Sequence, residues 1–245
     1  MYQLKNWFLL FFFSSLRLVV SAQPVTVSNE EILAYIADPQ KQDIEFFWKN
    51  DKGEILESFR NLKAYVESKG KELIFATNAG MFMQNLHPLG LFIQHGKTVT
   101  PLNTREGKTN FYLKPNGVFY ITTDNRAYIV ETSAFKNDGN VKFATQSGPM
   151  LVIDGKIHPA FRPGSSSRNV RNGVGILPDN RIVFAMSKGD INFYDFAQYF
   201  LNMGCREALY FDGVVSVAYL PEKNWMQMDG ICGVMIGVTR KKTNK

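Results

Sequence analysis

The sequence predicts an α+β fold in a single domain, with a mixed or antiparallel β-sheet core and two main helices. Many short apolar runs are separated by turn signals such as Asp124-Asn125 and Asp154-Gly155, a pattern typical of antiparallel strands. Two stretches, 53–70 and 193–203, instead repeat apolar residues at three- and four-residue steps, as amphipathic helices do. No linker or internal repeat interrupts 23–245, so we assign this range to one domain.

The N-terminal part of this domain is expected to begin with a short helix or docking segment at 29–37. In the helix at 53–70, Ile55, Phe59, Leu62 and Val66 share one face, and Gly70 ends the helix. A strand at 110–113 would pair with 118–122 in a hairpin around Pro115-Asn116-Gly117. The other strands predicted in this part cover 43–48, 73–76, 89–94 and 127–131.

The C-terminal part alternates predicted hairpins with the second helix. Asn192 would cap the start of the helix at 193–203, and Gly204 would end it. The range 161–169 is rich in Arg, Pro, Gly and Ser, which predicts a long irregular loop of the kind that often carries function. Predicted strands cover 151–153, 156–158, 174–177, 182–186, 208–211 and 231–238.

The first 22 residues have the pattern of a signal peptide. Lys5 forms a short positive region, Trp7–Phe13 is apolar, and Val20-Ser21-Ala22 offers small residues for cleavage. Arg17 falls late in the apolar stretch, and the alternative interpretation is an uncleaved N-terminal anchor. We therefore expect an exported protein, periplasmic or extracellular, with no stable membrane span after cleavage.

The charge balance argues against a nucleic-acid partner. The formal net charge is +6, but the basic residues are scattered apart from Arg240-Lys241-Lys242 at the tail. Nucleic-acid binding would need a dense basic stripe. A local preference for an anionic substrate remains compatible with this composition.

The two cysteines, Cys205 and Cys232, allow two interpretations. In an oxidising compartment two buried thiols can form a disulfide. Alternatively, both act as small hydrophobic core residues. Two cysteines alone do not make a zinc site.

The stretch Ala208–Ser216, ALYFDGVVS, is predicted to carry the central functional carboxylate. Its apolar first half is typical of a buried strand, which ends at Asp212. A second polar stretch, 167–173, contains Arg168 and Arg171 and leads into another strand. We expect the two stretches to meet at one site that combines an acid with a fixed cation, since guanidinium is suited to bidentate phosphate recognition.

One further strand end supplies small and polar residues. Asn78 and Gly80 follow one buried strand, where they would either face a ligand or simply form a tight turn. The histidines show no metal-ligand spacing, and neither a Gly-x-Ser-x-Gly elbow nor a P-loop is present, so we predict no metal and no cofactor. The candidate site residues are Asn78, Gly80, Ser147, Gly148, Arg168, Arg171, Asn172, Asp212, Gly213 and Ser216.

Four stretches, in order, resemble the phosphodiester glycosidase family and its bacterial exported branch. They are NAGMF (78–82), SGPM (147–150), RNGVG (171–175) and ALYFDGVVS (208–216). The resemblance implies an α+β domain with a cleft for a glycan-1-phosphodiester. It places Asn78, Arg171 and Asp212 in the site. The residues that would shape the site are Gly80, Gly148, Gly213 and Ser216.

The resemblance makes an exported hydrolase our leading hypothesis. Arg171, helped by Arg168, would hold the phosphate, and Asp212 would stabilise developing positive charge or activate water. The family pattern has Gly-Gly where this chain has Val214-Val215, which motivates the alternative of a non-catalytic module that binds anionic glycans at the cell surface. A metal-dependent phosphodiesterase is a third possibility. Candidates for a second carboxylate are Asp190, Asp195 and Glu207, so retention and inversion both stay open.

Overall fold

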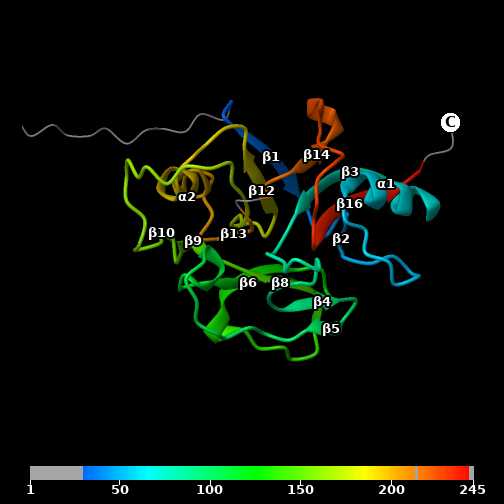
Figure 1. Ribbon diagram of the computed structural model, residues 1–245, viewed down its shortest axis with the longest axis horizontal. Coiled ribbons are helices and arrows are strands. Elements are labelled where there is room, and N and C mark those ends of the chain that lie inside the picture. Colours follow the sequence, from blue (N-terminus) through cyan, green and yellow to red (C-terminus); the bar gives the residue numbers. More distant parts are fainter. Residues whose placement is uncertain (1–29, 213–214, 243–245) are drawn as a thin grey trace, which may run out of the picture.

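The structure, a computed structural model, describes residues 30–212 and 215–242. The predicted signal peptide at 1–22 lies outside these described residues, as do Gly213 and Val214 of the central stretch. Within the described ranges the fold is α+β: three sheets, whose recorded strand pairs are all antiparallel, and two α-helices (Figure 1). The predicted fold class is confirmed.

The first sheet carries the central stretch and the helix α2 (Phe193–Asn202). Its strand order is β1 (Ile32–Ala37), β12 (Ile182–Ser187), β11 (Asn172–Ile176), β13 (Glu207–Tyr210), β9 (Met150–Ile153) and β10 (Lys156–Ile157). The predicted hairpins β9–β10 and β11–β12 are confirmed. Asn192 accepts a hydrogen bond from the backbone N–H of Asp195 and so caps α2 as expected, and Gly204 follows the helix with φ +89°.

The second sheet carries the helix α1 (Phe59–Ser68). Its strand order is β15 (Trp225–Met226), β14 (Ala218–Leu220), β3 (Lys71–Asn78), β16 (Met235–Lys241) and β2 (Asp43–Phe47). The third sheet has the order β5 (Lys97–Thr100), β4 (Phe92–Gln94), β8 (Val141–Ser147), β6 (Gly117–Thr122) and β7 (Ala127–Glu131). Short 3-10 helices are η1 (Asn110–Tyr112), η2 (Thr132–Ala134) and η3 (Pro221–Lys223).

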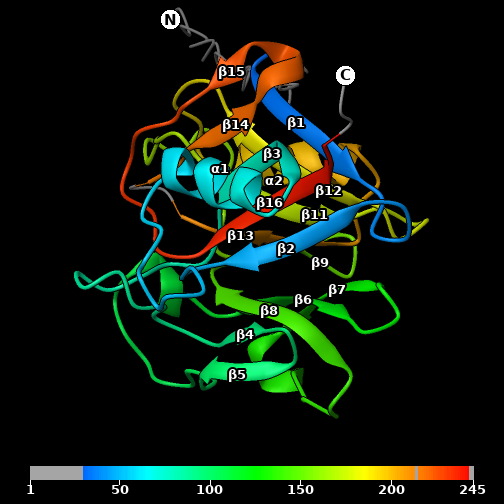
Figure 2. The same ribbon diagram turned by 90° about the vertical axis from the view of Figure 1, so that its right-hand side faces the viewer.

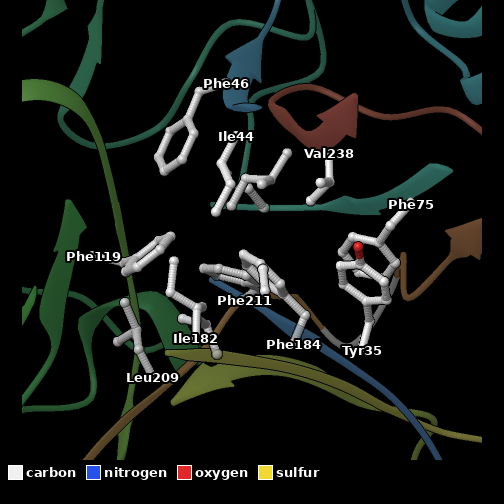
Figure 3. Packing of buried hydrophobic residues seen from close by; sticks show 14 of the residues in the cluster. Tyr35, Ile44, Phe46, Phe75, Phe119, Ile182, Phe184, Leu209, Phe211 and Val238 are labelled. Atoms are coloured by element: carbon white, nitrogen blue, oxygen red, sulfur yellow. The ribbon is translucent and has the colours of Figure 1, made fainter. Parts of the chain in front are cut away.

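The three sheets enclose one shared apolar core. Phe46 from β2 stacks on Phe119 of β6, with ring centroids 5.5 Å apart, and Phe75 of β3 stacks on Phe184 of β12 at 5.3 Å. Phe211, at the end of β13, projects into the same cluster (Figure 3). Because these rings come from all three sheets, burial of this core fixes the sheets relative to one another.

The helices cover the outer faces of two sheets, as Figures 1 and 2 show. α2 packs its buried Phe196 and Phe200 against the first sheet, and α1 packs Phe59, Leu62 and Val66 against the second. The third sheet lies along one side of this layered arrangement (Figure 1). Among the described residues, no helix is both long and apolar enough to cross a bilayer.

Three local expectations are wrong. The segment 29–37 contains the strand β1, because Ile32–Ala37 pairs with β12 over six residues. The predicted strand at 110–113 is the 3-10 helix η1, so the hairpin around Pro115-Asn116-Gly117 does not form, and β6 pairs with β7 and β8 instead. α1 begins at Phe59, not at 53, because Ser58 accepts from the backbone N–H of Asn61 and caps it there.

Both cysteines are free and buried, in different apolar clusters. Cys205 packs beneath α2, and Cys232 packs beneath α1. Burial raises the pKa of each thiol to about 12. The structure therefore confirms the interpretation that both cysteines are small hydrophobic core residues, and they do not form a disulfide with each other.

Candidate active site

The site begins where β11 and β13 lie side by side. Gly173 pairs with Tyr210 in this antiparallel ladder, and the backbone N–H of Phe211 donates to the carbonyl of Asn172 at 3.1 Å. The start of β11 and the end of β13 therefore lie at the same edge of the sheet. The two polar stretches singled out in the sequence do meet there.

Asn172 connects three segments at this edge through its side-chain amide. Its Nδ2 donates to Asn78 Oδ1 at 2.8 Å and to the Asn78 carbonyl at 2.9 Å, while its Oδ1 accepts from the backbone N–H of Asp212 at 3.1 Å. Asn78 in turn accepts from the backbone N–H of Val217 at 3.0 Å and donates to the carbonyl of Val215. Both asparagines are buried, so these bonds stand in for water. Asn78 and Asn172 hold the backbone on either side of Asp212.

Two serines fix the same turn. Ser216 Oγ donates to the carbonyl of Asp212 at 2.5 Å, and Ser147 Oγ donates to the carbonyl of Phe211 at 2.7 Å. Ser147 is fully buried at the end of β8 and so joins the third sheet to the end of β13. Their contacts are with the protein backbone, which makes both residues supports of the Asp212 segment.

The two predicted site glycines permit close backbone approaches. A Cβ on Gly80 would lie 2.6 Å from the carbonyl oxygen of Gln146, and one on Gly148 would lie 2.8 Å from that of Phe111. No side chain fits at such distances, so each glycine lets two segments touch. Both residues shape the fold around the site and neither lines the cleft described below.

Arg171 is buried behind the site, with 1% of its surface exposed. Its Nε donates to the carbonyl of Ile191 at 2.9 Å, Nη2 to the carbonyl of Ser167 at 3.0 Å, and Nη1 to the hydroxyl of Tyr210 at 3.4 Å. The guanidinium also lies over the Phe193 ring, 3.6 Å from its centroid. Every guanidinium nitrogen already has a protein acceptor. The structure therefore does not show the free guanidinium that the expected bidentate contact with phosphate would need.

Arg168 and the three candidates for a second carboxylate lie outside this cleft. Arg168 is exposed and donates to the carbonyl of Asp190 at 2.7 Å, in a hollow that Asp195 also lines. Glu207 accepts from the backbone N–H of Asp154, at the opposite end of β13 from Asp212. The structure therefore does not bring any of these four residues to the lining of the Asp212 cleft.

Asp212 lines a cleft of about 600 Å³, a size that suits a small ligand. Asp212 itself is 8% exposed. It is the only charged residue among the described residues that line this cleft. The other lining residues are Met81, Phe82, Met83, Gln84, Leu89, Thr109, Asn110, Asn169, Tyr210, Val215 and Ile231.

Tyr210 is a candidate functional residue that the sequence reasoning missed. Its hydroxyl accepts from Arg171 and hydrogen-bonds with Asn110, and burial raises its pKa to about 12, so the phenol keeps its proton. Side chains along a strand alternate between two faces, which puts Tyr210 on the same side as Asp212 and opposite to Phe211. This alternation along the strand could have identified Tyr210 from the sequence.

The described residues contain no group of three or more His, Cys, Asp or Glu side chains arranged to hold a metal ion.

Comparison with known sequences gives the family. Residues 71–232 match the sequence profile of the phosphodiester glycosidases. The chain belongs to this family. The uncharacterized protein YigE of Escherichia coli is similar, with 37% identity over 190 residues that cover 77% of this chain and 74% of YigE.

Solved structures share the fold of this family member. One is the catalytic domain of zebrafish N-acetylglucosamine-1-phosphodiester alpha-N-acetylglucosaminidase, auto-inhibited by its pro-peptide (TM-score 0.59, 13% identity, 88% of this chain and 86% of that one). Another is a putative exported protein from Burkholderia pseudomallei (TM-score 0.58, 10% identity, 84% and 73%). At these identities the likeness concerns the fold alone.

Proposed function

We propose that this phosphodiester glycosidase is an exported hydrolase, periplasmic or extracellular, that releases a sugar from a glycan-1-phosphodiester, with Asp212 as the catalytic carboxylate. Water adds to the anomeric carbon, the bond from that carbon to the phosphate oxygen breaks, and a phosphomonoester leaves. The observation that carries the proposal is the position of Asp212, held by Asn172 and Ser216 at the edge of an open cleft in a chain of this family.

Arg171 contributes to this reaction through Tyr210. Its charge lies directly behind the cleft wall, and Nη1 reaches the Tyr210 hydroxyl at 3.4 Å. A hydroxyl that accepts from a guanidinium is polarised toward donating its own proton. Tyr210 is 0% exposed, so the exposed Asn110, which hydrogen-bonds with Tyr210, offers the direct hydrogen bond to a phosphate oxygen, and Tyr210 and Arg171 support it from behind. Arg168 assists only at longer range, because it lines a different hollow.

Asp212 works next to a leaving group that needs little help. A phosphomonoester dianion or monoanion departs without a strong general acid, so one carboxylate is enough to stabilise the positive charge that develops on the sugar or to activate water. The described cleft lining has no second carboxylate, which agrees with a reaction that needs only one carboxylate.

The same lining also favours a second candidate, a module that binds anionic glycans without cleaving them. A glycosidase that depends on a pair of carboxylates would be inactive with Asp212 alone. In that case the cleft would hold the glycan, and Asn78, Asn172, Gly80, Gly148 and Gly213 would serve only to shape it.

Incubation with the methyl diester of N-acetylglucosamine 1-phosphate separates the two functions. We expect equal amounts of free sugar and methyl phosphate, measured by mass spectrometry, and none of either from Asp212→Asn. Saturable binding of the diester without either product would instead establish the binding module. The wild-type assay is run with and without a chelator, and loss of activity with the chelator would mean that a metal takes part.

A further inference from the structure

The cleft has an apolar wall that the protein core does not use. Phe82, Met83, Leu89 and Ile231 line the cleft, yet none of them belongs to any of the four apolar clusters of the core. Ile231 is 64% exposed and Met83 is 43% exposed. Exposed apolar side chains that gather at one hollow indicate a binding surface.

Backbone hydrogen bonds hold the part of this wall that comes from 81–89. The segment that carries Phe82 and Met83 folds back on itself, with the backbone N–H of Met83 donating to the carbonyl of His87 at 2.9 Å and that of Leu89 to Met81 at 2.9 Å. Trp48 Nε1 donates to the carbonyl of Leu86 at 2.8 Å and anchors the tip of the turn. Phe82, Met83 and Leu89 are therefore presented to the cleft by a hydrogen-bonded turn.

Apart from Gln84, the polar groups of the cleft come from other segments. Tyr210 ends β13, Asp212 follows two residues later, Thr109 and Asn110 lie at the start of η1, and Asn169 lies in the loop before β11. The lining thus combines a small set of polar groups with an apolar wall that includes several aliphatic side chains and one aromatic ring. A sugar and its phosphate would use the polar groups and would leave the aliphatic wall uncovered.

We propose that the substrate of this site carries a flexible hydrocarbon chain on its phosphate, and that Phe82, Met83, Leu89 and Ile231 bind the chain while Asp212 and Asn110 contact the sugar phosphate. The inference rests on the proposed function and names the class of its aglycone: an alkyl or isoprenoid phosphodiester of a sugar. The absence of any cation from the described lining fits this class, because such an aglycone adds no charge of its own.

Chain length is the direct test. We compare the methyl, butyl and octyl diesters of N-acetylglucosamine 1-phosphate below the concentrations at which they aggregate. Each methylene that leaves water against the wall should raise kcat/KM up to about fourfold, so the octyl diester should be cleaved at least tenfold more efficiently than the methyl diester. Equal kcat/KM for all three, with the methyl diester cleaved, would overturn the inference and leave the proposed function standing.

Substitutions on the wall give a matched comparison. Ile231→Gln and Met83→Gln should lower kcat/KM for the octyl diester about fivefold each and leave the methyl diester within twofold. Met226→Gln is the control, because Met226 is 56% exposed but does not line the cleft, and it should change neither. An equal loss on both diesters would mean that the wall does not bind the hydrocarbon chain.

A binding measurement makes the inference independent of catalysis. Octyl phosphate, the product from the octyl diester, should bind to the wild type with at least tenfold higher affinity than methyl phosphate in calorimetry, and Ile231→Gln should remove most of that difference. If no diester is cleaved but this preference is present, the proposed function fails and the apolar site remains. If neither phosphate binds in preference to the other, the inference fails.

Discussion

The side-chain amide of Asn172 donates to the side-chain oxygen of Asn78 at 2.8 Å and so joins the start of β11 to the end of β3. The two residues are 94 positions apart and come from different sheets. On its other side, Asn172 accepts from the backbone N–H of Asp212. One buried amide thus sets the distance between the segment that leads to the apolar wall and the segment that carries the carboxylate.

Replacing Asn172 should therefore cost stability. Asn172→Ala removes the two bonds to the oxygens of Asn78 and the acceptor of the Asp212 N–H, while Asn78 Oδ1 keeps its bond from Val217, so we expect a loss of about 3 kcal/mol in the free energy of unfolding. Asn172→Asp should cost more at neutral pH, because a carboxylate would face the Asn78 oxygens. That deficit should narrow as the pH falls, since a protonated carboxyl regains one donor. Urea denaturation at pH 5 and pH 8 measures both effects.

Asn169→Ala serves as the control for this experiment. Asn169 is an exposed asparagine that lines the same cleft, and its bonds to Ile191 run through the backbone. We expect a change within about 0.5 kcal/mol. An Asn172→Ala protein as stable as the Asn169→Ala protein would show that the amide network does not support the site.

Asp212 is expected to act in the reaction rather than in the fold. Asp212→Asn keeps the size of the side chain and leaves the backbone bonds to Asn172 and Ser216 in place. Turnover of the methyl diester should fall by about 10³-fold or more while the melting temperature stays within a few degrees. If the variant unfolds and its remaining folded fraction is fully active, the carboxylate is structural and the site is assigned to the wrong residue.

The sequence predicted the placement of this carboxylate well because the relevant signals are local. The apolar run before Asp212 and the turn between β11 and β12 are short-range patterns that place the two strands, and the order strand, strand, helix, strand indicated that both belong to one sheet. The strand β1 was missed because its identity depends on pairing with β12, about 150 residues away in sequence.

The environment of Arg171 could not be predicted in the same way. Its acceptors come from the loop at Ser167, the segment at Ile191 and the side chain of Tyr210. Phe193, which lies under the guanidinium, is the first residue of α2. No periodicity in the sequence brings these four groups to one point, and an arginine at the start of a strand is usually exposed.

Substitutions at Arg171 and Tyr210 separate charge from hydrogen bonding. Lysine has one nitrogen and cannot reach three acceptors, so Arg171→Lys should both destabilise the protein and strongly weaken cleavage of sugar phosphodiesters. A matched neutral glycoside, if cleaved at all, should be affected little once the folded fraction is taken into account. Tyr210→Phe removes only the hydroxyl and should lower kcat/KM for the diester about 10- to 100-fold in a folded protein.

Arg168→Lys is the control for charge at longer range. Arg168 is exposed and makes one bond, to the carbonyl of Asp190, so its replacement should change kcat/KM less than twofold. If Arg171→Lys lowers kcat/KM equally for charged and neutral substrates, neither Arg171 nor Tyr210 contributes to recognition of the phosphate. The phosphodiester assignment would then lose its main electrostatic support.

A stack of aromatic rings lies beneath Arg171, and its buried histidine should make the stability of the protein depend on pH in the acid range. His158 stacks on Phe161 with centroids 4.7 Å apart, and Phe161 stacks on Phe193, which carries the guanidinium, at 4.8 Å. His158 is 1% exposed. Burial lowers the pKa of His158 below its ordinary value of 6.5, and a backbone contact with Lys114 opposes this shift only in part.

The direction of the pH effect follows from proton counts. Between the lowered pKa of folded His158 and 6.5, the unfolded chain binds more protons than the folded one, so the free energy of unfolding falls as the pH falls through this window. The slope contributed by this group is at most about 1.4 kcal/mol per pH unit. Above pH 7 its titration contributes nothing. His158→Phe should remove this part of the acid sensitivity, whereas His95→Gln, at an exposed position, should keep it. Denaturant titrations from pH 5 to pH 8 measure the slopes, and identical slopes for His158→Phe and the wild type would show that protonation of His158 does not limit acid stability.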